Sequence, residues 1–152
     1  AITPVKFGIS FTTWHLNQAG ALVHIYCNDG SVHVNTGAIE MGQGTYNKIA
    51  QLAANEFGLP FNKIKVSATR TDKVPNTSAS AASSTTDLNG AATLNAISKI
   101  KMNLSAYVKR KYKIKDEGVY KNGTVKFKSK TFKFNKLIIF RSYKLNNRKE
   151  QR

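Results

Sequence analysis

The chain has 152 residues and a formal net charge of +16, and this length is enough for one domain with its own hydrophobic core. No run is apolar enough to span a membrane or to serve as a signal peptide, and the single cysteine, Cys27, excludes an intrachain disulfide and a cysteine zinc cluster. Residues 1–98 hold six basic and five acidic residues, a net +1, whereas residues 99–152 hold eighteen and three, a net +15. The sparse cysteine agrees with a reducing, cytoplasmic compartment.

Two segments early in the chain, residues 22–27 and 31–35, alternate between apolar and polar side chains. They flank residues 28–30, Asn-Asp-Gly, so the pattern predicts a β-hairpin with a short glycine-containing loop. Because side chains alternate across a strand, one face should carry Val23, Ile25 and Cys27, and the other His24 and Tyr26.

A helix is predicted over residues 45–57, with Thr45 as its cap, because apolar side chains recur there at helical spacing. Gly58 and Pro60 are expected to stop this helix. Residues 64–68 then alternate as a short strand.

A second, longer helix is predicted from about Asp87 to about Lys109. Asp87 suits the positive first turn of a helix, and the basic residues 109–111 suit its last turn. The apolar stripe of this helix is formed by Leu94, Ile97, Ile100, Leu104 and Val108.

The last third of the chain begins with a hairpin centred on Asn122 and Gly123, the strongest two-residue turn signal in the sequence. Its strands are expected over residues 120–121 and 124–127. The remaining elements are a short strand around Phe132 and Phe134 and a short helix over residues 137–143 capped by Asn135. Hairpins and short strands with two main helices packed on them make an α+β fold.

Two polar loops lead into the two predicted helices. Residues 37–45 contain Gly-Gln-Gly, and residues 73–90 carry seven hydroxyl side chains with Lys73 and Asp87 as their only charges. Small side chains let the backbone approach a ligand, and free N–H groups at a helix N-terminus favour phosphate. The loops are therefore candidates for a two-sided cradle for a phosphate-bearing cofactor. A tight strand-to-helix turn and a flexible Ser/Ala/Thr linker are the alternatives.

Several motifs recur together in one family, in this order and spacing: residues 7–12, 15–24, 40–44, 74–78, 81–83 and 87–90. They closely resemble the molybdenum-binding large subunit of the xanthine dehydrogenase family, which belongs with aldehyde oxidase to the molybdenum hydroxylases, and the form at residues 15–18 is closest to bacterial members. The resemblance is strongest over residues 1–108 and weaker over residues 109–152. The whole chain, 1–152, is thus expected to be part of a molybdopterin-binding domain.

The resemblance implies the function and the cofactor. The family oxidatively hydroxylates hypoxanthine and xanthine with water as the oxygen source, at a molybdenum–molybdopterin centre. Electrons leave through iron–sulfur clusters and FAD to a nicotinamide. The implied partners are the rest of the molybdenum subunit, the FAD and iron–sulfur subunit or domains, and a purine substrate, in an oligomeric whole enzyme without a membrane anchor.

The resemblance also assigns site residues. The expected cofactor-binding residues are Gly42, Gln43, Gly44, Ala82, Ser83 and Thr85. Among them Gln43 is the leading candidate, because its amide can both donate and accept beside a metal oxo group or the pterin. No catalytic residue is expected in this chain, because the general-base Glu of the family lies in a later segment, and Glu40 is interpreted as structural. His15, His24 and His33 lack the spacing of a metal site, and the family holds molybdenum through the pterin dithiolene.

The sequence departs from the family at Thr36, Ala38 and Ile39, where members usually have His, Gly and Thr, and Ile39 could perturb the turn. The chain also begins and ends inside the longer family sequence. We therefore expect a fragment or truncated product that is inactive alone and does not bind the cofactor tightly.

Two alternatives stay open. Aldehyde oxidase-type chemistry is the nearest, because the residues that select a purine over an aldehyde lie outside this chain. From another class, residues 99–152 interleave cations with aromatics, as in a small basic module that binds nucleic acid. A solvated basic surface is the favoured interpretation of that segment.

Overall fold

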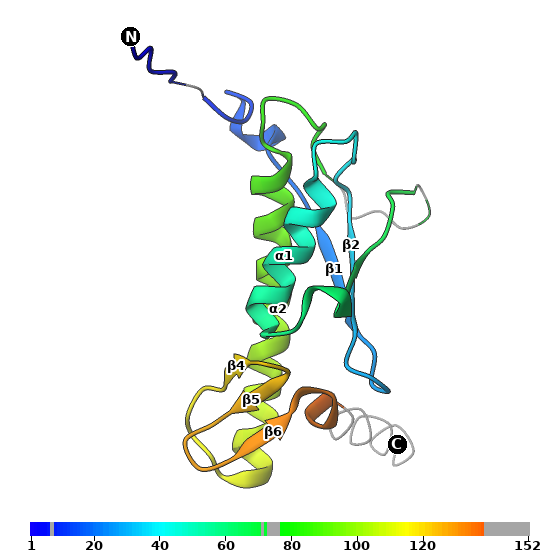
Figure 1. Cartoon of the computed structure of the whole chain (residues 1–152), viewed down its shortest axis with the longest axis vertical. Coiled ribbons are helices and arrows are strands. Elements are labelled where there is room, and N and C mark those ends of the chain that lie inside the picture. Colours follow the sequence, from blue (N-terminus) through cyan, green and yellow to red (C-terminus); the bar gives the residue numbers. More distant parts are fainter. Residues whose placement is uncertain (7, 71, 73–76, 139–152) are drawn as a thin grey trace.

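The computed structural model describes residues 1–6, 8–70, 72 and 77–138 (Figure 1). The elements in chain order are η1 (Trp14–Leu16), β1 (Ala21–Ile25), β2 (Val32–Thr36), α1 (Thr45–Phe57), η2 (Phe61–Lys63), β3 (Ile64–Val66), α2 (Thr85–Tyr112), β4 (Val119–Lys121), β5 (Thr124–Lys126) and β6 (Thr131–Lys133). The predicted α+β class is confirmed. In the described part of the chain, no helix is both long and apolar enough to cross a membrane.

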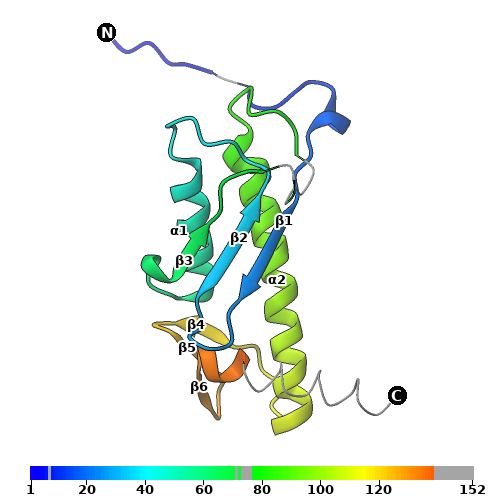
Figure 2. The ribbon, with the colours of Figure 1, turned by 90° about the vertical axis from the view of Figure 1, so that its right-hand side faces the viewer.

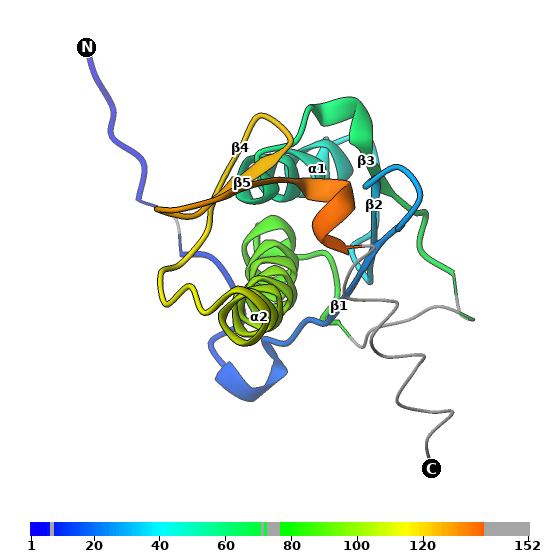
Figure 3. The same ribbon diagram turned by 90° about the horizontal axis from the view of Figure 1, so that it is seen from below.

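The first sheet has the strand order β1-β2-β3. β1 and β2 form the predicted antiparallel hairpin, with Val23 opposite Val34, and β3 joins β2 in parallel. Both long helices cover one face of this sheet (Figures 2 and 3). Val34 is fully buried under them, whereas His24 and Tyr26 are exposed on the bare face, as the alternation predicted.

The turn of this hairpin is held by the carboxylate of Asp29. Its Oδ1 accepts hydrogen bonds from the backbone N–H and the hydroxyl of Ser31, at 3.0 and 2.7 Å, and its Oδ2 lies 3.3 Å from Nζ of Lys63. These bonds, above all the one from the Ser31 N–H, lower the pKa of Asp29 to about 2.

We expect the turn to loosen only in strong acid. Because the folded-state pKa of Asp29 is lowered, its contribution to stability is present above the ordinary value of 3.8 and is lost as the pH falls towards 2. The Ser31 amide shift in an NMR pH titration should therefore have a midpoint near 2, and Asp29→Asn should abolish the transition. A midpoint at the ordinary carboxyl value would contradict this prediction.

Helix α1 has the predicted limits, Thr45–Phe57, but its N-cap is different. Gly44, in the left-handed region with φ +78°, holds the cap position, and Thr45 is the first helical residue. The prediction that Thr45 caps the helix was therefore wrong. At the other end the N–H of Leu59 donates to the carbonyl of Ala54 at 3.0 Å around the left-handed Gly58, which is a glycine-ended helix stop.

Helix α2 runs from Thr85 to Tyr112, two residues earlier and three later than predicted. Its buried stripe changes character along its length, because polar Asn89 and Thr93 come first and apolar Ile97, Leu104 and Val108 follow.

The second sheet is an antiparallel meander, β4-β5-β6. Its first turn is the predicted one, with positive φ at both Asn122 and Gly123. Strand β6 ends at Lys133, so Phe134 belongs instead to a helical turn over residues 134–138. Asn135 lies inside this turn and does not cap it, contrary to the prediction. The rest of the helix predicted up to residue 143 lies outside the described residues.

One core joins the two sheets. The fully buried ring of Phe57, at the end of α1, packs 5.3 Å from Phe134 and 6.4 Å from Tyr120. The N–H of Gly123 donates to the carbonyl of Gly58 at 2.8 Å beside this cluster. The meander is thereby fixed under one end of α1 and α2, and the opposite end carries the polar loops (Figure 1).

Candidate cofactor-binding site

The two polar loops lie side by side at the end of the molecule opposite the meander (Figures 1 and 2). The backbone N–H of Ile39 donates to Oγ of Ser80 at 3.4 Å, which links the first loop to the second. Of the second loop, residues 77–90 are described, and the predicted residues 73–76 lie outside the described part. The N-termini of α1 and α2 therefore open towards the same region.

The N-terminal segment supports the second loop from its other side. The N–H of Ser78 donates to the carbonyl of Gln18 at 2.8 Å, and the N–H of Ser10 donates to the carbonyl of Ala82 at 3.0 Å. The Ser78 hydroxyl also hydrogen-bonds the carbonyl of Leu16. These bonds join four of the sequence motifs, residues 7–12, 15–24, 74–78 and 81–83, at the second loop.

A buried asparagine links the segments that form the site through hydrogen bonds. Oδ1 of Asn89, a residue that is 1% exposed, accepts from the hydroxyls of Thr36 at 2.8 Å and Thr77 at 3.3 Å. Its Nδ2 donates to the carbonyl of Thr85 at 3.0 Å. Asn89 thus connects the end of β2, the second loop and the first turn of α2.

Glu40 organises the first loop. Its Oε1 accepts the N–H groups of Gly42 at 2.8 Å and Gly44 at 2.9 Å, and its Oε2 accepts that of Tyr46 at 3.0 Å. The hydrogen bond from the Tyr46 N–H is the largest cause that lowers the pKa of Glu40 below its ordinary value. This geometry supports a structural role for Glu40.

The side chain of Gln43 folds back onto its own loop. Its Nε2 donates to the carbonyl of Ile39 at 2.8 Å, and its Oε1 accepts from the N–H of Met41 at 2.5 Å. Gly42 and Gly44 have positive φ, and no atom lies within 4 Å of the position where a Cβ would sit. The loop therefore presents open space beside an amide that can donate and accept.

The second loop places two consecutive residues in the left-handed region, Ala82 with φ +49° and Ser83 with φ +52°. The hydroxyl of Ser84 donates to the carbonyl of Ala81 at 2.9 Å, and this residue makes no side-chain cap to α2. The first N–H groups of α2 are therefore not capped by Ser84, and such a helix end favours an anion.

The donors of the two loops fit a phosphate-bearing cofactor. Residues 37–45 and 77–90 contain no Lys or Arg, so an anion would be held by backbone N–H groups, hydroxyls and the α2 dipole. The expected cofactor-binding residues Gly42, Gln43 and Gly44 belong to the first loop, and Ala82, Ser83 and Thr85 belong to the second loop and the start of α2. Ile39, the departure that could have perturbed the turn, has a side chain that is half exposed, and its backbone takes part in the loop hydrogen bonds.

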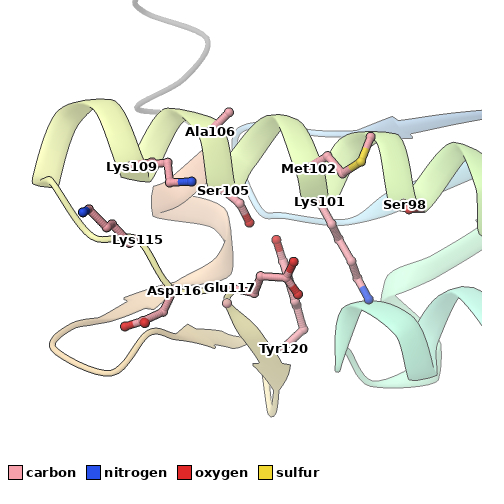
Figure 4. A pocket seen from close by; sticks show the side chains of 11 residues that line it. Ser98, Lys101, Met102, Ser105, Ala106, Lys109, Lys115, Asp116, Glu117 and Tyr120 are labelled. Atoms are coloured by element: carbon pink, nitrogen blue, oxygen red, sulfur yellow. The ribbon is translucent and has the colours of Figure 1, made fainter.

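A pocket of about 600 Å³ lies elsewhere, between α2 and the segment leading into β4 (Figure 4). Lys101, Lys109, Asp116, Glu117 and Tyr120 are among its lining residues. Burial raises the pKa of the Tyr120 phenol to about 12. This pocket belongs to the meander end of the molecule and does not extend the two loops.

The three histidines are not gathered at one place in the fold. His24 and His33 are paired across β1 and β2, and His15 lies in η1. No cluster of three or more His, Cys, Asp or Glu side chains suited to a metal ion occurs among the residues that the structure describes.

Sequence reasoning missed Asn89 and its two threonine partners. A signal was available, because Asn89 and Thr93 continue the stripe of Ile97 at a spacing of four residues. A polar residue on the buried stripe of a helix requires a hydrogen-bond partner.

Comparison with known proteins identifies the family to which this chain belongs. The profile of the family described as "Molybdopterin cofactor-binding domain" matches residues 1–151. Xanthine dehydrogenase 1 of Arabidopsis thaliana is 56% identical over 100 residues, covering 66% of this chain and 7% of the relative. Xanthine dehydrogenase of Emericella nidulans is 52% identical over 107 residues, or 70% and 8%.

A solved structure agrees with these relatives. The reconstituted CO dehydrogenase from Oligotropha carboxidovorans superposes with a TM-score of 0.71 at 25% identity, covering 81% of this chain and 16% of that one. The matched part of this chain covers only 7–8% of the length of the curated relatives given above. The matches confirm the resemblance to molybdenum hydroxylases drawn from the motifs, and the chain belongs to the molybdopterin cofactor-binding domain family.

Proposed function

We propose that this chain supplies two cofactor-binding loops to a molybdenum hydroxylase that oxidises hypoxanthine or xanthine, with water as the oxygen source. The observation that carries the proposal is the juxtaposition of residues 37–45 with residues 77–85 at the open ends of α1 and α2. The names of the relatives support xanthine dehydrogenase chemistry, and aldehyde oxidase-type chemistry is the nearest alternative.

Each loop has a distinct part in this proposal. Backbone N–H groups of Ala82, Ser83 and Thr85 hold the anionic part of the cofactor at the N-terminus of α2. The Gly42-Gln43-Gly44 turn faces the pterin and metal end, where the Gln43 amide exchanges its hydrogen bonds within the loop for bonds to the ligand. When bound, the molybdenum centre supplies the redox chemistry, and the protein supplies position and polarity.

The remaining parts of the reaction belong to other segments or chains. We propose that residues 1–152 form part of a molybdopterin-binding domain, with residues 1–108 as its most family-like portion. A Glu outside this chain acts as the general base, and FAD and iron–sulfur partners take the electrons within an oligomeric enzyme. The cytoplasm is the proposed compartment, supported by the single cysteine.

Isolated molybdopterin should bind the chain weakly and only at the two loops. In a ¹⁵N-labelled sample of the whole chain under anaerobic conditions, we expect saturable amide shifts at residues 42–44 and 82–85. Gln43→Ala should weaken these shifts, because it removes the only long amide side chain of the first loop. The matched control is Gln51→Ala, which removes an exposed amide on α1.

Two results would contradict this assignment. Shifts confined to the lysines of the meander would indicate non-specific attraction of an anion to the basic end. Stoichiometric retention of molybdenum by this chain alone would show that the site needs no further segment.

The structure does not favour the nucleic-acid alternative. The rings of Phe127 and Phe134 are buried, and those of Tyr112 and Phe132 pack 5.1 Å apart. Stacking on unpaired bases requires exposed aromatic faces. The alternation of cations and aromatics therefore builds a core with a lysine-rich outer surface.

A further inference from the structure

We propose that Glu40 is a positioning residue of the cofactor site, whose carboxylate acts as a built-in anion at the N-terminus of α1 and holds the turn that carries Gln43. The inference rests on the proposed function and extends it. A cofactor anion would then find the N-terminus of α1 already occupied and would settle at that of α2.

The carboxylate of Glu40 takes the place of a side-chain cap. The N-cap residue of α1 is Gly44, which has no side chain to accept a hydrogen bond. Glu40 accepts from the N–H groups of Gly44 and Tyr46 instead, at 2.9 and 3.0 Å. A negative charge at this point also complements the positive end of the helix dipole.

The same carboxylate fixes both neighbours of Gln43. Its Oε1 accepts from Gly42 on one side and Gly44 on the other, so the backbone that bears the glutamine is held at two points. Both glycines have positive φ and could adopt many other conformations in its absence. Glu40 thereby sets the position from which the Gln43 amide can reach a ligand.

The two adjacent helix ends differ in consequence. At α1 the Glu40 carboxylate accepts from the first N–H groups, whereas at α2 the cap hydroxyl of Ser84 turns back to Ala81 and the carboxylate of the first turn, Asp87, has an exposed side chain. A second anion at α1 would be repelled by Glu40 and would find its hydrogen-bond donors taken. This asymmetry directs the anionic part of the cofactor to Ala82, Ser83 and Thr85.

The first test is a pH titration of the amide signals in the whole ¹⁵N-labelled chain. The groups that lower the pKa of Glu40 are backbone N–H groups, with no charged side chain among them. Gly42, Gly44 and Tyr46 should therefore share one transition below the ordinary glutamate value, and Glu40→Gln should abolish it. Asp29→Asn is the matched control, because it removes the turn-holding carboxylate of the β1–β2 hairpin and should affect its partners Ser31 and Lys63 but not the amides around Glu40.

The second test replaces the missing carboxylate with acetate. In Glu40→Ala, acetate should give saturable shifts at Gly42, Gly44 and Tyr46 that are absent from the unmodified chain. Isolated molybdopterin should likewise begin to shift the amides at the start of α1 in this variant. If Glu40→Ala does not fold, the pH titration of the first test decides the inference, because it needs only the unmodified chain and Glu40→Gln, whose amide oxygen keeps one acceptor for the turn.

Independent transitions at the three amides, or an equal acetate response with and without Glu40, would overturn the inference. The pH and acetate readouts need no cofactor. If the pH and acetate results are as expected but molybdopterin shifts no amide of the two loops, the role of Glu40 as the anion of α1 is supported and the proposed function is refuted. If the pH and acetate results contradict the expectation but molybdopterin binds at both loops, the proposed function is supported and the inference about Glu40 is refuted.

Discussion

Gly58→Ala should destabilise the chain by about 2–5 kcal/mol, although it adds a single methyl group. Gly58 has φ +59°, a conformation that costs an L-residue about 1–2 kcal/mol. A Cβ there would lie 2.6 Å from backbone atoms of Tyr120 and Lys121, and overpacking of this kind costs about 1–3 kcal/mol. The Gly123 N–H bound to the Gly58 carbonyl prevents the two segments from simply moving apart.

Gly123→Ala is the matched control for this prediction. Its φ of +67° carries the same backbone penalty, but no atom lies within 4 Å of the position of its Cβ. We expect a loss of only about 1–2 kcal/mol, for the left-handed conformation alone. Urea denaturation followed by circular dichroism measures both variants. Equal losses would mean that the junction between α1 and the meander yields to the extra methyl group.

Gly58 shows which of its structural roles a local sequence pattern can predict and which it cannot. A glycine before Leu-Pro predicts a helix stop, because a left-handed residue can end a helix without strain. Nothing in that pattern indicates that β4 passes against the same backbone atoms. The contact joins Gly58 to Lys121, far apart in the sequence, and such pairings depend on how the elements pack.

The limits of the elements were predictable to different degrees. The hairpins around residues 28–30 and 122–123 follow from turn residues and alternation, which are local properties. The parallel pairing of β3 with β2 was not predicted, because it requires the chain to return across the sheet after α1. Helix α2 extends to Tyr112, beyond the expected end, and the Tyr112 ring packs against Phe132, a long-range contact that helical spacing does not indicate.

The sequence also indicated the two loops that the structure brings together, while their use as a cofactor site stays a prediction. Composition and glycine content identified both loops, since small and polar side chains are a local signal. The hydrogen bonds that Glu40 makes to Gly42, Gly44 and Tyr46 could not be read from spacing alone. They give a physical reason for the structural role of this carboxylate, which the sequence suggests only through the resemblance to a family whose general base lies in a later segment.

Asn89→Ala should destabilise the fold by about 1–3 kcal/mol and separate the two loops. The Thr36 hydroxyl is buried and donates to Asn89, so the substitution leaves it without its acceptor, and a buried unsatisfied group carries a cost of this size. Thr77 loses the same acceptor. The better helix propensity of Ala offsets only part of the loss, because Ala and Asn differ by less than about 0.7 kcal/mol.

We expect Asn89→Ala to abolish cofactor binding at the two loops even in the molecules that remain folded. Asn89 is the buried link between the end of β2, which leads into the first loop, and the second loop. Hydrogen exchange should accelerate in Asn89→Ala at the amides of Ser78 and Ser10, which donate to Gln18 and Ala82, and the molybdopterin-induced shifts should disappear while the meander amides stay unchanged. Asn55→Ala, an exposed asparagine on α1, is the control and should alter stability by less than about 0.5 kcal/mol. Intact molybdopterin shifts in Asn89→Ala would mean that the loops are positioned by their own backbone bonds and do not need this asparagine.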